Sequence, residues 1–263
     1  MSKARPYDEY EIKRLYYQAN VGWEKEARNM IGFGLRDGMS ILEIGSGPGF
    51  ITKNLSELVP NGSITCVDMD TFLMQHAEKY LKENARCEYR IIEGNIMEVD
   101  LPHNAFDFAQ VRFVLQYIPD TVGFARRVKN FLKPGGKLVI VEPDADIGPT
   151  SHPALPHARY ILEKSRQAQI AFGADPMLGR KLWRLFKTAG YKNFDLDAIT
   201  CHSGNKGMEW CYPAFDPDRV VELVHAGFVT EQELADYRQV IKEFLDSEDP
   251  FYLKVLMMGC GEK

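Results

Sequence analysis

Three closely spaced glycines follow an apolar run near the start of the chain. Gly45, Gly47 and Gly49 come directly after Ser40–Ile44, and the amphipathic run Ile51–Val59 begins just beyond them. Glycine lets a backbone approach a ligand closely, and the start of a helix offers unpaired N–H groups and a positive dipole end. A strand that ends in such a loop and opens a helix is therefore predicted to bind a nucleotide.

A carboxylate and the glycine spacing refine this prediction. Asp68 lies at the end of the next apolar run, Ser63–Met69, where a carboxylate can accept hydrogen bonds from both ribose hydroxyls. A dinucleotide-binding enzyme needs the pattern G-x-G-x-x-G, but the third glycine would fall at Phe50. The spacing here is G-x-G-x-G, preceded by Glu43, which disfavours a nicotinamide-dependent oxidoreductase and leaves it as an alternative.

Alternating strands and helices would have to position these residues. Apolar runs predict strands at residues 40–44, 63–69, 88–93, 106–112 and 137–142, and helical periodicity predicts helices between them. Such alternation is typical of a parallel sheet with helices on both faces.

The second half of the chain has a looser pattern. Residues 144–157 are predicted as a Pro-rich loop, 193–201 and 251–258 as two further strands, and 203–249 as mostly helical. The fold class that follows is α/β, with a Rossmann-like, seven-stranded, mostly parallel sheet, helices on both faces and a helical cap. At the other end of the chain, the apolar stripe from Ile12 to Ile31 predicts one N-terminal helix.

We expect a single domain over residues 1–263. Its parts would be N-terminal cap helices in 1–35, a cofactor-binding core in 36–142, and completion of the sheet with substrate-cap insertions in 143–263.

The motifs of the first half resemble those of the class I S-adenosylmethionine-dependent methyltransferases, in particular the bacterial small-molecule type. Glu43–Gly49 resembles the first motif and Val67–Asp70 the second. Gly94–Ile96 resembles the stretch that meets the adenine, with Asn95 where many relatives have Asp. Order and spacing match across about Met39–Glu142, and beyond residue 142 only the general layout is similar.

The resemblance implies S-adenosyl-L-methionine as the cofactor and methyl transfer to a small molecule by in-line displacement, with an O, N, S or C nucleophile. The implied cofactor-binding residues come from the strand ends and the glycine loop: Glu43, Gly45, Ser46, Gly47, Asp68, Met69, Asn95, Ile96 and Arg112. A methyltransferase acting on RNA or protein is the alternative activity, and a non-catalytic member of the family is a third possibility.

Candidates for chemistry and acceptor binding lie outside the motifs. His152 and His157 follow the fifth strand and are candidate general bases, although a histidine in such a loop is more often only solvated. Tyr17 and Gln18, on the predicted N-terminal helix, and Trp210, in the late insertion, are candidates for contact with the acceptor.

Composition limits the classes of partner. The net charge of −5 gives no global attraction for nucleic acid or anionic lipid. The five cysteines are dispersed without a C-x-x-C pair, which favours reduced thiols and gives no support for a metal site. We therefore expect a cytoplasmic enzyme that acts on a small molecule, uses no metal and binds neither nucleic acid nor membrane. The possibility of a homodimer stays open.

Overall fold

A mostly parallel sheet forms the centre of the molecule. The computed structural model describes residues 9–263, and within them eight strands form one sheet. Five strands run parallel in the spatial order β3-β2-β1-β4-β5, with the bounds Glu88–Glu93, Ser63–Asp68, Ser40–Ile44, Phe106–Arg112 and Leu132–Pro143. The predicted α/β, Rossmann-like arrangement is confirmed.

The remaining strands extend the sheet beyond β5. β8 (Phe251–Glu262) runs antiparallel to β5 and also pairs with β7 (Lys192–His202). The start of β8 pairs with β6 (Thr150–His152), a strand that lies inside the segment predicted as a loop. Seven strands were predicted and β6 is the eighth, because three residues are too few to show an alternating pattern.

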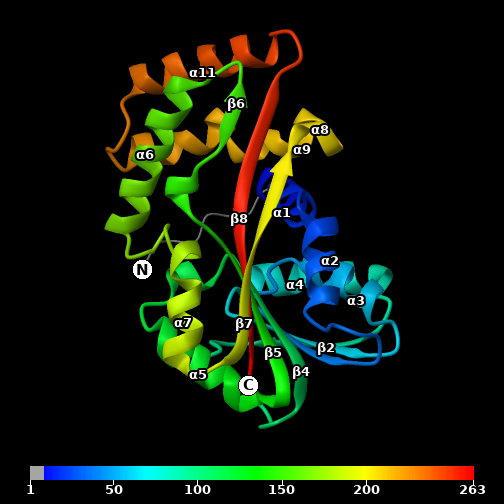
Figure 1. Ribbon diagram of the computed structural model, residues 1–263. Coiled ribbons are helices and arrows are strands. Elements are labelled where there is room, and N and C mark those ends of the chain that lie inside the picture. The colour runs from blue at the N-terminus through cyan, green and yellow to red at the C-terminus, as the bar shows by residue number, and fades with distance from the viewer. Residues whose placement is uncertain (1–8) are drawn as a thin grey trace.

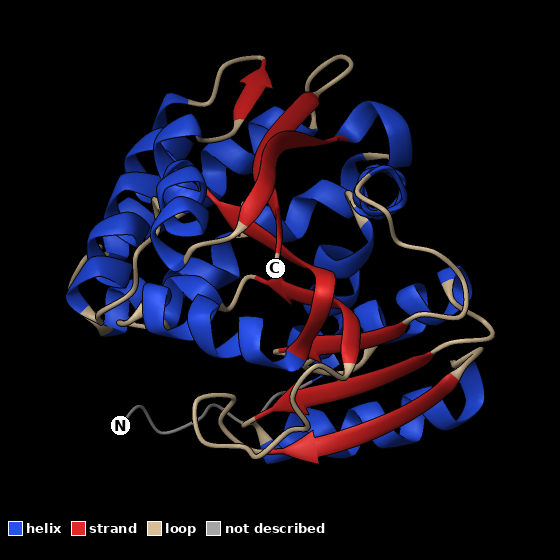
Figure 2. Ribbon diagram, turned by 60° about the horizontal axis from the view of Figure 1, so that its bottom comes forward, coloured by secondary structure: helices blue, strands red, loops and turns tan. Residues whose placement is uncertain are grey.

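Helices cover both faces of the sheet (Figures 1 and 2). On one face, α5 (Thr121–Phe131) and α7 (Leu182–Ala189) bury their apolar stripes against the strands. On the other face lie α2 (Trp23–Gly32), α3 (Phe50–Leu58) and α4 (Thr71–Asn84). Two of these helices begin at a side-chain cap: Asp70 accepts a hydrogen bond from Leu73 N–H before α4, and Asp120 accepts one from Gly123 N–H before α5.

A mainly helical cap lies beyond the carboxyl ends of the parallel strands (Figure 1). It contains α6 (Pro156–Ala171), α11 (Glu231–Leu245) and the short helices α8 (Ser203–Lys206), α9 (Met208–Cys211) and α10 (Val221–His225). The cap has an apolar core of its own, in which Leu155, Phe215 and Tyr237 are buried. Within residues 9–263, no helix combines the length and apolar character that crossing a membrane requires.

The N-terminal segment forms two helices where one was predicted. α1 (Glu9–Asn20) ends before Gly22, and α2 begins at Trp23. A Cβ atom on Gly22 would lie 2.7 Å from Cys201 Sγ, so the chain passes β7 too closely for a side chain and changes direction there. The first eight residues of the expected 1–35 cap segment lie outside the described residues.

Candidate functional site

The glycine loop makes a tight turn between β1 and α3. Gly45 has a φ of +74°, a region that favours glycine, and its N–H donates to Val67 O at 2.7 Å. A Cβ atom at Gly45 would lie only 2.1 Å from Val114 Cγ2, in the segment that follows β4. The backbone of the loop can therefore occupy this position only without a side chain.

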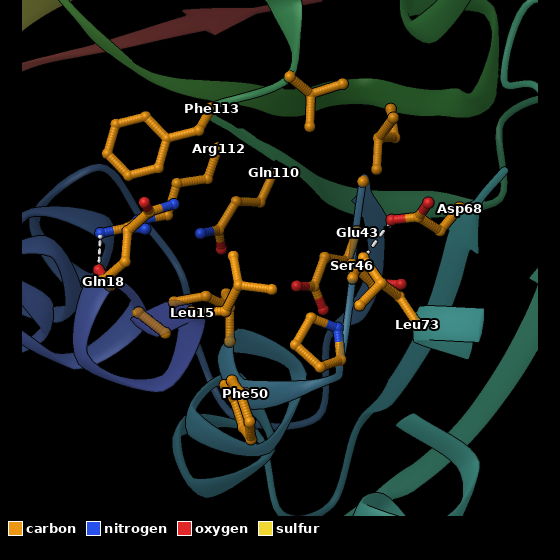
Figure 3. A pocket seen from close by; sticks show the side chains of 17 residues that line it. Leu15, Gln18, Glu43, Ser46, Phe50, Asp68, Leu73, Gln110, Arg112 and Phe113 are labelled. Atoms are coloured by element: carbon orange, nitrogen blue, oxygen red, sulfur yellow. Dashed lines mark hydrogen bonds between the residues drawn. The ribbon is translucent and has the colours of Figure 1, made fainter. Parts of the chain in front are cut away.

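A cavity of about 170 Å³ opens at this loop, between α1 and the carboxyl ends of β1, β2 and β4. Figure 3 shows its side chains converging from these elements. Seven residues that the sequence singled out line it: Gln18, Glu43, Gly45, Ser46, Gly47, Asp68 and Arg112. Phe50, which stands where a dinucleotide enzyme has its third glycine, also lines the cavity from the first turn of α3.

Asp68 lines this cavity, and its carboxylate has acceptor sites that no donor from the described part of the chain fills. It accepts from Gly47 N–H at 2.7 Å and from Asp70 N–H at 3.0 Å. Burial raises the pKa of the Asp68 carboxyl, although these N–H donors act in the opposite direction. Because two carboxylate oxygens offer about four acceptor sites, Asp68 can still accept from a pair of ribose hydroxyls.

Two buried polar side chains lie on neighbouring strands inside the cavity. Glu43 on β1 pairs in register with Gln110 on β4, and both reach into the cavity in Figure 3. Among the described residues, Glu43 Oε2 and both polar atoms of the Gln110 amide have no hydrogen-bond partner. Burial raises the pKa of Glu43 to about 8, although a hydrogen bond with Thr52 opposes this shift. Buried polar groups are normally paired, so these atoms are the expected partners of a ligand.

Sequence reasoning missed Gln110. The only available signal was an uncharged polar residue between two apolar ones, Ala109 and Val111, in the strand Phe106–Arg112.

Arg112 lines the cavity but is engaged with the N-terminal helices. Its Nε and Nη2 donate to the two oxygens of Glu26, each at 2.9 Å, and Nη2 also donates to Gln18 O at 2.8 Å. Both side chains are buried, with 7% of Arg112 and 0% of Glu26 exposed. Arg112 therefore fixes α1 and α2 to β4 and positions Gln18 at the wall of the cavity.

Three residues that were expected to bind the cofactor do not line the cavity. Met69 is 73% exposed beside Asp68. Asn95 follows β3 at the same edge of the sheet, and its side chain accepts from Met97 N–H at 3.0 Å. Ile96 is buried in the main core. Their expected role at the adenine stays a prediction.

The candidate histidines and two candidate acceptor contacts lie elsewhere. His152, in β6, is exposed and lines no cavity at the sheet edge, and His157 lines a separate hollow on the cap. Tyr17 and Trp210 pack edge to face with ring centroids 5.0 Å apart, outside the cavity of the glycine loop. Of the three expected acceptor contacts, the structure brings only Gln18 to the site.

A second cavity, of about 580 Å³, adjoins the first. Five residues line both cavities: Leu15, Gln18, Asp68, Leu73 and Phe113. The far walls of the second cavity come from the cap, including α6, the segment 214–223 and the start of β8. The volume lies within the range of about 300–1,000 Å³ that is usual for small-molecule sites.

Comparison with known proteins identifies relatives that match about half of the chain. A family described as "Methyltransferase domain" matches residues 35–190. The demethylmenaquinone methyltransferase of Lactococcus lactis subsp. lactis is 33% identical over 138 residues, 52% of this chain and 52% of that protein. The protein of the same name from a Geobacillus species is 28% identical over 140 residues, covering 53% and 56% of the two chains. The chain spans about half the length of these relatives.

Solved structures share the fold over more of the chain. A SAM-dependent methyltransferase from Aquifex aeolicus has a TM-score of 0.54 and 19% identity, covering 70% of this chain and 89% of its own. Phosphoethanolamine N-methyltransferase 2 from Haemonchus contortus, with phosphomonomethylethanolamine and S-adenosylhomocysteine, has a TM-score of 0.59 and 17% identity. That match covers 98% of this chain and 59% of the other.

Proposed function

The chain belongs to the family of S-adenosylmethionine-dependent methyltransferases, and from that premise we propose that it methylates a small molecule. The observation that carries the proposal is the pair of adjoining cavities at the carboxyl edge of the sheet. Ligands of open α/β sheets bind at this edge. The cavity at the glycine loop would hold the cofactor, and the larger cavity under the cap would hold the acceptor.

The residues of the smaller cavity fit the cofactor at both of its ends. Glu43 and Gln110 present unpaired buried oxygens, which suit the ammonium group of a methionine moiety. Asp68 suits the ribose hydroxyls, and the positive φ of Gly45 lets the backbone pass close to the ligand. S-adenosylmethionine supplies a methyl group that is already activated by attachment to a sulfonium.

The protein would contribute alignment and exclusion of water. Leu15, Gln18 and Phe113 line both cavities and so lie at the boundary between cofactor and acceptor. Holding two reactants in an in-line arrangement can supply most of the catalytic effect for such a displacement. The cap covers this boundary, which favours a small acceptor over RNA or a protein side chain.

The five cysteines have free thiols, which suits a reducing compartment and our proposal that the enzyme acts in the cytoplasm.

Methyl transfer can be tested without knowing the acceptor. The protein would be incubated with S-adenosylmethionine labelled in the methyl group and a bacterial cell extract divided into small-molecule, RNA and protein fractions. We expect label in the small-molecule fraction only. Label confined to RNA or protein would overturn the choice of acceptor class.

We expect Asp68→Ala to weaken binding of S-adenosylhomocysteine by about 1.5–3 kcal/mol, because hydrogen bonds to a charged group are lost. Isothermal titration calorimetry would measure the change. Asp100→Ala, which removes an exposed carboxylate in the loop between β3 and β4, is the control and should bind normally. Normal binding by the Asp68 variant in a folded protein would show that Asp68 does not contact the ribose.

A further inference from the structure

The cavity under the cap is lined by several cationic side chains. Arg14 and Arg166 are each paired with a carboxylate: Arg14 Nε lies 2.7 Å from Glu11 Oε2, and Arg166 Nη2 lies 2.5 Å from Glu163 Oε1. The other two cations of the wall are Arg219 and Lys254. They come from distant parts of the chain, the 3-10 turn Pro217–Val220 and the strand β8.

Arg219 and Lys254 form no ion pair within residues 9–263. Arg219 Nη1 donates to a backbone carbonyl, Pro213 O, at 3.1 Å. Lys254 Nζ lies 5.6 Å from the centre of the Phe113 ring. Lys254 is half-buried, whereas Arg219 is exposed. A half-buried cation without a counter-charge is costly, so Lys254 in particular is suited to bind an anion that enters the cavity.

Several acids that line the same cavity are already engaged, and Glu11 is the partner of Arg14. Asp144 accepts from Arg180 Nε and Nη2, each at 2.6 Å. Asp216 accepts from the hydroxyls of Tyr10 and Tyr212 and from Asp218 N–H. Neither carboxylate forms an ion pair with Arg219 or Lys254.

The two cations also act on each other. Burial, followed by repulsion from Arg219, lowers the pKa of Lys254 to about 8; Arg112 and Arg14 lower it further, and Cys201 opposes the shift. Both side chains line the same cavity, so both can act on one ligand bound there.

We propose that Arg219 and Lys254 form an anion subsite, and that the methyl acceptor carries a carboxylate or phosphate group that they bind. Lys254 contacts Phe113, which lines both cavities, so the anion would lie near the boundary with the cofactor. This inference rests on the proposed function and narrows it from a small molecule to an anionic one.

Ligand-observed NMR titration would test the subsite with simple probes. Benzoate, phenyl phosphate and the neutral benzamide would be titrated into protein saturated with S-adenosylhomocysteine. We expect at least one anion to bind tenfold or more tightly than benzamide, and the stronger of the two identifies the preferred anion. Equal binding of all three probes, or binding of none, would overturn the proposal.

Variants distinguish anion binding at the subsite from a general response of anions to the net charge of the protein. Arg219→Met and Lys254→Met should each weaken binding of the preferred anion about tenfold or more, and leave the affinity for S-adenosylhomocysteine unchanged. The control Lys82→Met removes an exposed cation in the last turn of α4 and should change neither. An equal loss in the control would show that the anions respond only to net charge. Failure of S-adenosylhomocysteine itself to bind would overturn the proposed function instead.

The pH dependence of anion binding gives an independent readout. Lys254 must be protonated to attract an anion. The affinity for the anion should therefore fall as pH rises through about 8, which is the pKa of Lys254 in the protein without bound anion. Arg219 keeps its charge throughout this range. The decline should be absent in Lys254→Met, whereas a decline of equal size in that variant would contradict a role for Lys254.

Discussion

Gly45→Ala is expected to lower the affinity for S-adenosylhomocysteine by a hundredfold or more. Two costs combine at this position. The backbone has a φ of +74°, which costs an L-residue about 1–2 kcal/mol, and the new Cβ would lie 2.1 Å from Val114 Cγ2. Relief of that overlap must displace either the glycine loop or the segment after β4, both of which line the cofactor cavity.

Gly38→Ala is the matched control for the glycine experiment. Gly38 also has a positive φ, +81°, but a Cβ there meets no atom within 4 Å. This variant should lose about 1 kcal/mol of stability and bind S-adenosylhomocysteine normally, as calorimetry and urea denaturation would measure. If both variants bind normally, the close approach at Gly45 has no role in the site.

Arg112→Met is expected to lower the free energy of unfolding by about 3–5 kcal/mol, because it leaves a buried carboxylate without its partner. Glu26 is 0% exposed, and both of its oxygens accept from Arg112. Equilibrium urea denaturation would measure the loss. The double variant Glu26→Leu with Arg112→Met should recover much of it, since neither charge then stays buried. A double variant as unstable as the sum of the single variants would contradict this account of the pair.

The ion pair between Arg112 and Glu26 also affects the geometry of the site. Because Arg112 holds the carbonyl of Gln18 as well as Glu26, its loss should loosen the wall that the two cavities share.

The cofactor side of the site could be predicted from sequence because its signals are local. The glycine loop, Glu43 and Asp68 lie within a few residues of strand ends, and apolar runs locate those strands. The acceptor side could not be predicted in this way. Its walls come from segments far apart in sequence, such as those of Gln18, Arg219 and Lys254, and the chain gives no local pattern that brings them together.

The N-terminal segment shows how one residue can mislead a periodicity argument. A single helix from Ile12 to Ile31 would set Tyr17 and Gln18 on the same ligand-facing side. The break at Gly22 is fixed by its approach to Cys201, a tertiary contact that helical periodicity does not contain. Tyr17 and Gln18 are both in α1, before the break, and adjacent residues point about 100° apart around a helix. Gln18 lines the site, whereas Tyr17 packs against Trp210 outside the cofactor cavity.

A crystal structure with S-adenosylhomocysteine bound would test the account most directly. We expect the amino group of the ligand to lie within hydrogen-bond distance of Glu43 and Gln110, and its ribose hydroxyls within reach of Asp68. Its sulfur should face the boundary at Gln18 and Phe113, with Arg219 and Lys254 across the acceptor cavity. A ligand bound elsewhere, or bound with its sulfur facing away from that cavity, would contradict the division of the site into cofactor and acceptor cavities.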